Sequence, residues 1–238
     1  DNRFLSFEQF RRLVAHALTL SDCPWLGLEV GINAQLSMHG ALGQAVAACN
    51  GVAEALLLCQ RYMPLRQRIF GIAIATGELA SITAVEEIDV PDVREFMLGY
   101  LAATLVRLME AVTGQPLKND FTMEWPFPEP AWANQYQRLA AHNTFGHAQL
   151  RGMVVSDLLQ RPSLSADPEA LRIAERECER QLTIQQQGGT LTQRIQFRLA
   201  SCKGIYPSII EMAIEENVSS RTLIRYLRDE GTTYQQLL

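Results

Sequence analysis

Residues 208–231, which read SIIEMAIEENVSSRTLIRYLRDEG, carry the clearest structural signals in the chain. They open with Ser208 and Glu211 at the spacing of a capping box, in which each side chain bonds to the backbone N–H of the other residue. Such a box marks the start of a helix. We therefore predict a short helix over about 209–216.

A second helix is expected after about three residues. Ser219 suits its N-cap and Gly231 suits its end, so the second helix covers about 220–229. Asn217 tolerates the left-handed backbone that a tight turn between the helices needs. Two short helices joined in this way predict a helix-turn-helix.

The apolar spacing predicts which side of each helix is buried. We expect a small shared core of Ile210, Val218, Leu223 and Leu227, with Ala213 where the helices approach closely. The outer surface then carries Ser220, Arg221, Thr222, Arg225 and Arg228. Arginine can pair bidentately with guanine edges, and hydroxyls can bond phosphates. The pattern alone also fits an ordinary solvated helix face.

This region resembles the DNA-binding part of the AraC/XylS family of bacterial regulators. The matching residues are Ser219, Arg221, Thr222, Leu223, Arg225, Leu227, Glu230, Gly231 and Thr232. The resemblance implies that Arg221 and Arg225 contact bases or phosphates. From the helix geometry we also expect Arg228 on the same outer surface, with Ser219, Ser220 and Thr222 positioning the helix.

The N-terminal part resembles the effector domain called arabinose-binding-like, which occurs in ornithine- and virulence-type AraC regulators. The resemblance rests on Leu26–Gly31, His39–Gly43, Glu54–Leu56 and Arg61–Tyr62. It implies a domain that binds a small effector, whose identity the domain's name does not fix. The two similarities together cover nearly the whole chain.

Two features depart from the AraC/XylS pattern. Glu216 and Asn217 stand where the family usually has leucine and glycine, so the first helix is expected to pack less well. Family members also carry two helix-turn-helix units in tandem, and this sequence ends at Leu238, where the connecting helix should begin. One unit alone is expected to bind DNA weakly, because the phosphate contacts of the second are missing.

The rest of the chain predicts an α+β domain over 1–185, followed by an all-α region over 189–238. A polar linker is expected at 185–189, and a helix opens at Asp167-Pro168. Earlier helices are predicted at 6–20, 40–49, 51–64, 92–113 and near 131–141. Strands are predicted at 69–74 and 80–85 as a hairpin, at 119–125 and within 144–154.

Composition limits the class of protein. The chain has 238 residues, 47% of them hydrophobic, and a net charge of −5, so it is globular and acidic. An acidic balance counts against DNA binding by the whole surface, though not by a small reader on an acidic domain. The five cysteines have no zinc-site or disulfide spacing. With no signal peptide and no long apolar span, a cytoplasmic protein without membrane contact is expected.

Candidates for effector contact are few. His39 and Arg61 could line a pocket, and so could Tyr100 and Trp125, although core packing, capping or internal ion pairing explains each of them equally well. The apolar face of helix 92–113 fits either a dimer interface or plain core. No catalytic motif, cofactor fingerprint or metal-ligand spacing is present.

The sequence therefore predicts a DNA-binding transcriptional regulator, not an enzyme, that takes promoter DNA and a small-molecule effector as partners. A homodimer remains open, as does the choice between activation and repression. The alternative is a small-molecule-binding or enzymatic domain whose C-terminal helices make protein contacts.

Overall fold

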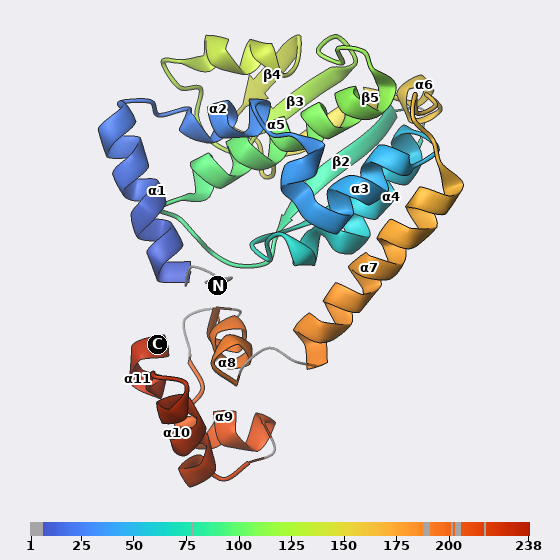
Figure 1. The fold of residues 1–238 in the computed structure, drawn as a ribbon. Helices are drawn as coiled ribbons and strands as arrows, with labels where there is room; N and C mark the ends of the chain where they lie inside the picture. Colours follow the sequence, from blue (N-terminus) through green and yellow to red (C-terminus); the bar gives the residue numbers. More distant parts are fainter. Residues whose placement is uncertain (1–6, 78, 188–190, 201, 203–205, 217) are drawn as a thin grey trace.

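The structure is a computed structural model that describes residues 7–77, 79–187, 191–200, 202, 206–216 and 218–238. Its N-terminal part combines a mixed sheet with helices, and its C-terminal part is helical (Figure 1). The predicted fold class, an α+β domain followed by an all-α region, is confirmed.

The N-terminal sheet has five strands in the order β1-β2-β5-β3-β4. Neighbouring strands are antiparallel except for β3 and β4, which are parallel. The predicted hairpin is formed by β1 and β2, with Ile74 opposite Ile82. The strand bounds are Phe70–Ala75 for β1, Leu79–Glu86 for β2, Phe121–Trp125 for β3, His142–Phe145 for β4 and Arg151–Val155 for β5.

Helices pack against this sheet, most of them where the apolar periodicity predicts them. The segment after Pro24, which the sequence left unassigned, is a helix, and the helix expected near 131–141 is a 3₁₀ helix. The bounds are Phe7–Ser21 for α1, Leu26–Ile32 for α2, Leu36–His39 for η1, Gly40–Ala48 for α3, Val52–Tyr62 for α4, Met63–Leu65 for η2, Arg94–Thr113 for α5, Ala133–Arg138 for η3, Ser156–Leu159 for α6 and Pro168–Gln187 for α7.

Helix α5 is the central helix of the N-terminal domain. By length and composition it is the one helix in the described chain that could cross a membrane. However, 67% of its most apolar 18-residue stretch is buried inside the protein. That burial is typical of a core helix. Its apolar face packs within its own domain, as Leu98 and Met109 show, so the hypothesis that this face is a dimer interface is wrong.

Two glycines of α2 let this helix lie against α5. A Cβ added at Gly27 would lie 2.0 Å from the carbonyl oxygen of Phe96, and one at Gly31 would lie 2.5 Å from the Cβ of Ala103. Atoms cannot approach that closely, so each position requires a hydrogen in place of a side chain.

Helix α7 starts where the sequence predicts it, because the Asp167 carboxylate accepts hydrogen bonds from the backbone N–H groups of Glu169 and Ala170. Its end differs from the prediction. The helix continues to Gln187, so the expected linker at 185–187 is wrong. Glutamine is a good helix former, so three glutamines can continue the helix. Residues 188–190, the rest of that linker, lie outside the described part of the chain.

The C-terminal region has a hydrophobic core of its own. Eight buried residues form it, and Ile195, Met212 and Leu223 are completely enclosed. The helices are Leu191–Ala200 for α8, Ile209–Glu215 for α9, Ser220–Asp229 for α10 and Tyr234–Leu237 for α11.

We predict that Gly27→Ala destabilises the N-terminal domain by about 1–3 kcal/mol, because the added methyl group overpacks the contact with the α5 backbone. The measurement is urea unfolding followed by circular dichroism. Gly77→Ala is the control, since a Cβ there meets nothing closer than the Leu79 carbonyl oxygen at 3.4 Å. An unfolding midpoint shared by both variants would contradict this account of the helix contact.

Candidate DNA-binding surface and effector cavity

The first helix of the predicted helix-turn-helix begins at its capping box. The Ser208 hydroxyl accepts a hydrogen bond from the Glu211 N–H at 3.3 Å, and the Glu211 carboxylate accepts one from the Ser208 N–H at 2.7 Å. The bond from the Ser208 N–H, with a smaller contribution from the Ser208 hydroxyl, lowers the pKa of Glu211, because it stabilises the charged carboxylate. The capping-box prediction is confirmed.

The second helix, α10, begins at Ser219 as expected. The Ser219 hydroxyl accepts a hydrogen bond from the Thr222 N–H at 3.1 Å and lies 2.8 Å from the Thr222 hydroxyl. Both hydroxyls therefore already take part in the cap. Gly231 follows the helix with a φ of 78°, a left-handed conformation that favours glycine.

Helices α9 and α10 pack through the residues that face each other. Leu223, Leu227 and Ala213 are buried as predicted, and Val218 packs against them. Ile210 was expected in this core and is instead 61% exposed. Met212 and Ala213 are the buried positions of α9. Ile209 precedes them by three and four residues, so it lies on the same inner side of the helix. The prediction for Ile210 is thus wrong by one helical position.

An ion pair involves the unusual Glu216. Its carboxylate accepts hydrogen bonds from the Arg194 guanidinium on α8, at 2.8 Å and 2.6 Å. This ion pair links the end of α9 to α8, so the two helices are held together without a leucine at position 216. Asn217, the second departure from the family pattern, lies outside the described residues.

A further bond joins the end of α10 to the start of α8. The Glu230 carboxylate accepts hydrogen bonds from the backbone N–H groups of Leu191 and Thr192, at 3.1 Å and 2.9 Å. These N–H groups lack partners within their own helix, so the carboxylate acts as a distant cap. Helix α10 is therefore anchored by a buried face and by a polar contact beyond its last turn.

The three predicted arginines form one exposed stripe along α10. Arg221, Arg225 and Arg228 follow i, i+4, i+7 spacing, and each side chain is exposed while Leu223 and Leu227 face inward. None of the three forms an ion pair with any residue that the structure describes. The Arg225 guanidinium lies 5.4 Å from the Tyr226 ring centre, which keeps it beside the helix.

The carboxylates of Glu215 and Glu216 at the end of α9 do not neutralise this stripe. Glu215 is paired with Arg198 at 2.8 Å, and Glu216 is paired with Arg194. Ser220 and Thr222 are half-buried at the start of the same helix. The stripe therefore combines unpaired positive charge with the N-terminal end of a helix, a combination that suits a phosphate backbone.

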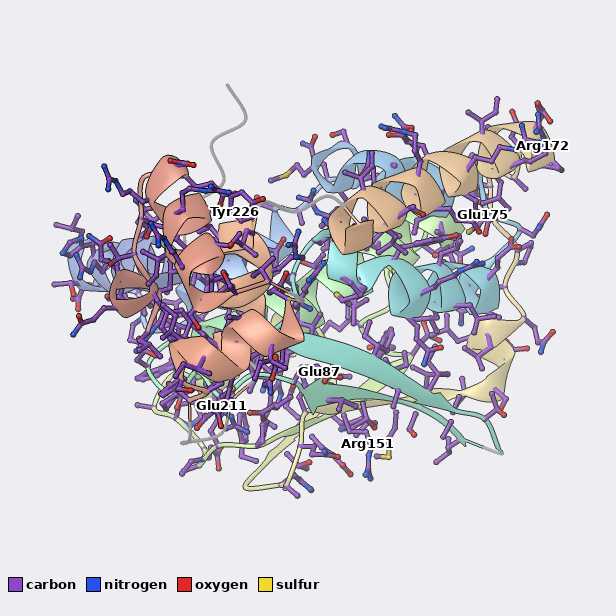
Figure 2. The ribbon with its side chains drawn as sticks, turned by 90° about the horizontal axis from the view of Figure 1, so that it is seen from below. Glu87, Arg151, Arg172, Glu175, Glu211 and Tyr226 are labelled. Carbon is purple, nitrogen blue, oxygen red and sulfur yellow. The ribbon has the colours of Figure 1, made fainter. Side chains whose placement is uncertain are left out.

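Figure 2 shows α9 and α10 at one end of the molecule, with Glu211 and Tyr226 labelled on them. Arg172 and Glu175, labelled on α7, lie at the other end of that view. These side chains of α7 are therefore well separated from α9 and α10.

Two of the four effector candidates have other roles. The Arg61 guanidinium pairs with Glu179 of α7 at 2.8 Å and is exposed, so it joins two helices. Trp125 is completely buried, its indole N–H donates to Asn143 at 2.9 Å, and its ring packs against Tyr136. Neither residue lines a cavity described below.

The other two candidates, His39 and Tyr100, line the same cavity of about 40 Å³ between η1, η2 and α5. Thr104 lines it too and was missed, because a single threonine in an apolar helix carries no sequence signal. Burial, with a smaller contribution from the nearby Arg66 guanidinium, lowers the pKa of His39 below its usual 6.5. The imidazole is therefore neutral near pH 7.

In the described part of the chain, no group of three or more His, Cys, Asp or Glu side chains is placed to hold a metal ion. All five cysteines are free thiols. Burial raises the pKa of Cys59 to about 12, so this thiol is protonated and is an inert core residue.

Comparison with known proteins identifies the family. The sequence model described as the arabinose-binding domain of AraC transcription regulators, N-terminal, matches residues 1–163. The chain belongs to the AraC family. Its similarity to a Pseudomonas aeruginosa ornithine utilization regulator is 32% identity over 100% of this chain and 70% of that protein.

Other relatives agree with this assignment. Two mycobacterial proteins, from Mycobacterium bovis and Mycobacterium tuberculosis, are named as uncharacterized HTH-type transcriptional regulators; each is 24% identical over 96% of this AraC-family chain and 67% of its own length. The crystal structure of the transcriptional regulator CdpR from Pseudomonas aeruginosa shares the fold. It has a TM-score of 0.58 and 22% identity, covering 100% of this chain and 83% of that one.

We predict that Ser219→Ala destabilises the C-terminal helical region by about 1 kcal/mol, because the first turn of α10 loses its cap. Ser219→Asp is the matched control, since its carboxylate can accept the same bond. Amide hydrogen exchange along α10 measures the difference. Equal protection of α10 in the alanine and aspartate variants would show that the cap does not stabilise this helix.

We also predict that His39 makes the N-terminal domain less stable in mild acid. Its pKa is lowered by folding, so the unfolded chain takes up the proton first as the pH falls through 6.5, and the folded state loses stability from there downward. Urea unfolding between about pH 7.5 and pH 5.5 should show a smaller loss for His39→Gln than for the unaltered chain. The exposed His16 supplies the control variant, His16→Gln, and an effect of the same size there would remove His39 as the cause.

Proposed function

We propose that this AraC-family chain is a sequence-specific DNA-binding regulator of transcription, controlled by a small molecule held in its N-terminal domain. The observation that carries DNA binding is the exposed stripe of Arg221, Arg225 and Arg228, which has no ion-pair partner among the described residues. Unpaired arginines on the outer face of a short second helix suit contacts with guanine edges and phosphates.

Within this proposal the residues have different roles. Arg221 and Arg225 contact bases or phosphates, and Arg228 lies beside them. Ser219, Ser220 and Thr222 set the helix start, with Ser219 and Thr222 acting mainly through the cap that they already form. The effector domain covers 1–185 and the DNA-binding region 189–238. DNA as a partner implies a cytoplasmic location.

Effector control is supported by the location of the cavity. Arg66, Met97 and Tyr100 line both the small cavity and a larger cleft of about 1310 Å³, whose other wall includes Leu199 and Tyr206 of the C-terminal region. A ligand that shifts these shared side chains changes the surface that the DNA-binding region faces. Such control requires the ligand to prefer one arrangement of the two parts.

A catalytic role is not part of this proposal. The relatives are named as regulators, and the sequence has no nucleophile, phosphate-loop or metalloprotease motif. One observation favours a second function, protein contact by the C-terminal helices: Ile210 and Ile214 of α9 are 61% and 70% exposed. Exposed apolar side chains on one helix face are typical of an interaction surface.

We predict that Arg225→Ala weakens binding to a DNA site selected from a random-sequence pool by about 5- to 150-fold if Arg225 reads a base, since such a contact contributes about 1–3 kcal/mol. If it contacts only phosphate, binding should weaken equally for all sequences and the salt slope should fall by about one. Gel-shift titrations at several salt concentrations measure both quantities.

Arg172→Ala is the matched control, because Arg172 is an exposed arginine on α7 whose partner, Glu169, belongs to the same helix. It should leave DNA affinity unchanged. Equal affinities for the Arg225 variant, the Arg172 variant and the unaltered chain would remove Arg225 from the DNA contacts. Failure to select any DNA site would favour the protein-contact function.

A further inference from the structure

The cavity beneath α5 has two buried polar atoms without partners. His39 Nε2 and Thr104 Oγ1 accept and donate no hydrogen bond within the described chain, although each residue is about nineteen-twentieths buried, at 5% and 6% exposure. Buried polar atoms are normally paired, and each one that is not costs folding free energy. Both atoms belong to residues that line one cavity.

Two other polar residues of the lining, Gln67 and Arg66, already have hydrogen-bond partners. The Gln67 side chain donates to the Phe70 carbonyl and accepts from the backbone N–H groups of Ile69 and Phe70. Arg66 is exposed and donates to the Met38 carbonyl at 2.9 Å, so it lies at the opening toward the cleft. Among the buried polar atoms of the described lining residues, His39 Nε2 and Thr104 Oγ1 are therefore the ones without a hydrogen-bond partner.

The remaining wall is apolar. It is made by side chains such as Leu42, Met63, Phe70 and Leu108. A second apolar cavity of about 30 Å³ shares Leu101 and Leu105 with it and continues along α5 over the sheet. The two cavities are thus neighbours with Leu101 and Leu105 between them, and His39 and Thr104 line only the first.

We propose that this cavity is the effector site and that its ligand is a small, uncharged, mainly apolar molecule with one hydroxyl or carbonyl group. The polar group bonds His39 and Thr104, and the apolar body lies against Leu101 and Leu105. This inference rests on the proposed function, because it supplies the effector that the regulator needs.

The charge of the lining excludes ionic ligands. Among the described residues that line the cavity there is no aspartate or glutamate, so a ligand ammonium group would have no anionic partner there. A buried carboxylate would face a neutral imidazole, and Arg66, the cation in this described lining, is out at the edge. An uncharged hydroxyl or carbonyl, in contrast, pairs with a neutral histidine and a threonine without burying charge.

The size of the cavity limits the ligand. A single water needs about 10–15 Å³ of such space, so the described cavity holds a molecule of few heavy atoms. A longer apolar body extends into the second cavity when the Leu105 side chain changes rotamer. Affinity in a homologous series should therefore rise about fourfold per methylene, as expected for burial of apolar surface, until the space is filled.

The test uses primary alcohols from ethanol to 1-hexanol as probes of the whole 238-residue chain. Long-range ¹H–¹⁵N NMR of the imidazole rings follows His39, with His16, His142 and His147 as internal references. We expect the His39 Nε2 signal to shift and saturate, with tighter binding for longer alcohols. Butanoate and L-ornithine, as anionic and dibasic probes, should leave it unchanged.

A matched pair of variants separates the hydroxyl contact from packing. Thr104→Val keeps the side-chain shape and removes the hydroxyl, so alcohol affinity should fall about threefold to tenfold, as for one lost hydrogen bond. Thr104→Ser keeps the hydroxyl and should retain it. Thr183→Val, at an exposed position on α7, should change nothing.

Several outcomes overturn the proposal. A His39 signal that no alcohol shifts to saturation means that the cavity holds only water, and tighter binding of butanoate or ornithine means that the ligand class is wrong. Equal alcohol affinity in the valine and serine variants also overturns it. None of these results bears on DNA binding. If the chain selects no DNA site but still binds alcohols, the regulator function is contradicted and the cavity remains a ligand site.

Discussion

The burial of Leu223 and Leu227 against α9 governs the whole C-terminal region. Because an α-helix turns about 100° per residue, fixing these two leucines inward turns Arg221 and Arg225 outward. The caps at Ser208 and Ser219 set where each helix starts, and Glu230 bonds α10 to the start of α8. The arginine stripe is thus a geometric consequence of a small apolar core and three polar anchors.

Local rules predicted much of this molecule. The capping box, the Ser219 cap, the Asp167 cap and the β1–β2 hairpin each depend on residues close together in sequence, and all are present. Predictions that needed tertiary partners were less successful. Ile210 was placed in the core although Ile209 occupies that side, and a linker was expected where α7 continues.

The candidate effector residues show the same limit. His39 and Tyr100 do share a cavity, but only the fold shows that Thr104 joins them or that Arg61 is held by Glu179 across 118 positions of sequence. A buried polar atom without a partner leaves no periodic signature. The cleft beside the cavity also involves residues from both parts of the chain, and this juxtaposition is visible only in three dimensions.

The account is tested by mapping which arginines a bound DNA covers. Phenylglyoxal labelling followed by mass spectrometry compares the chain with and without a selected DNA site. Arg221, Arg225 and Arg228 should lose most of their labelling in the complex, while Arg172 and Arg180 on α7 should keep theirs. A complex in which the three α10 arginines react as readily as in the free chain would contradict the account.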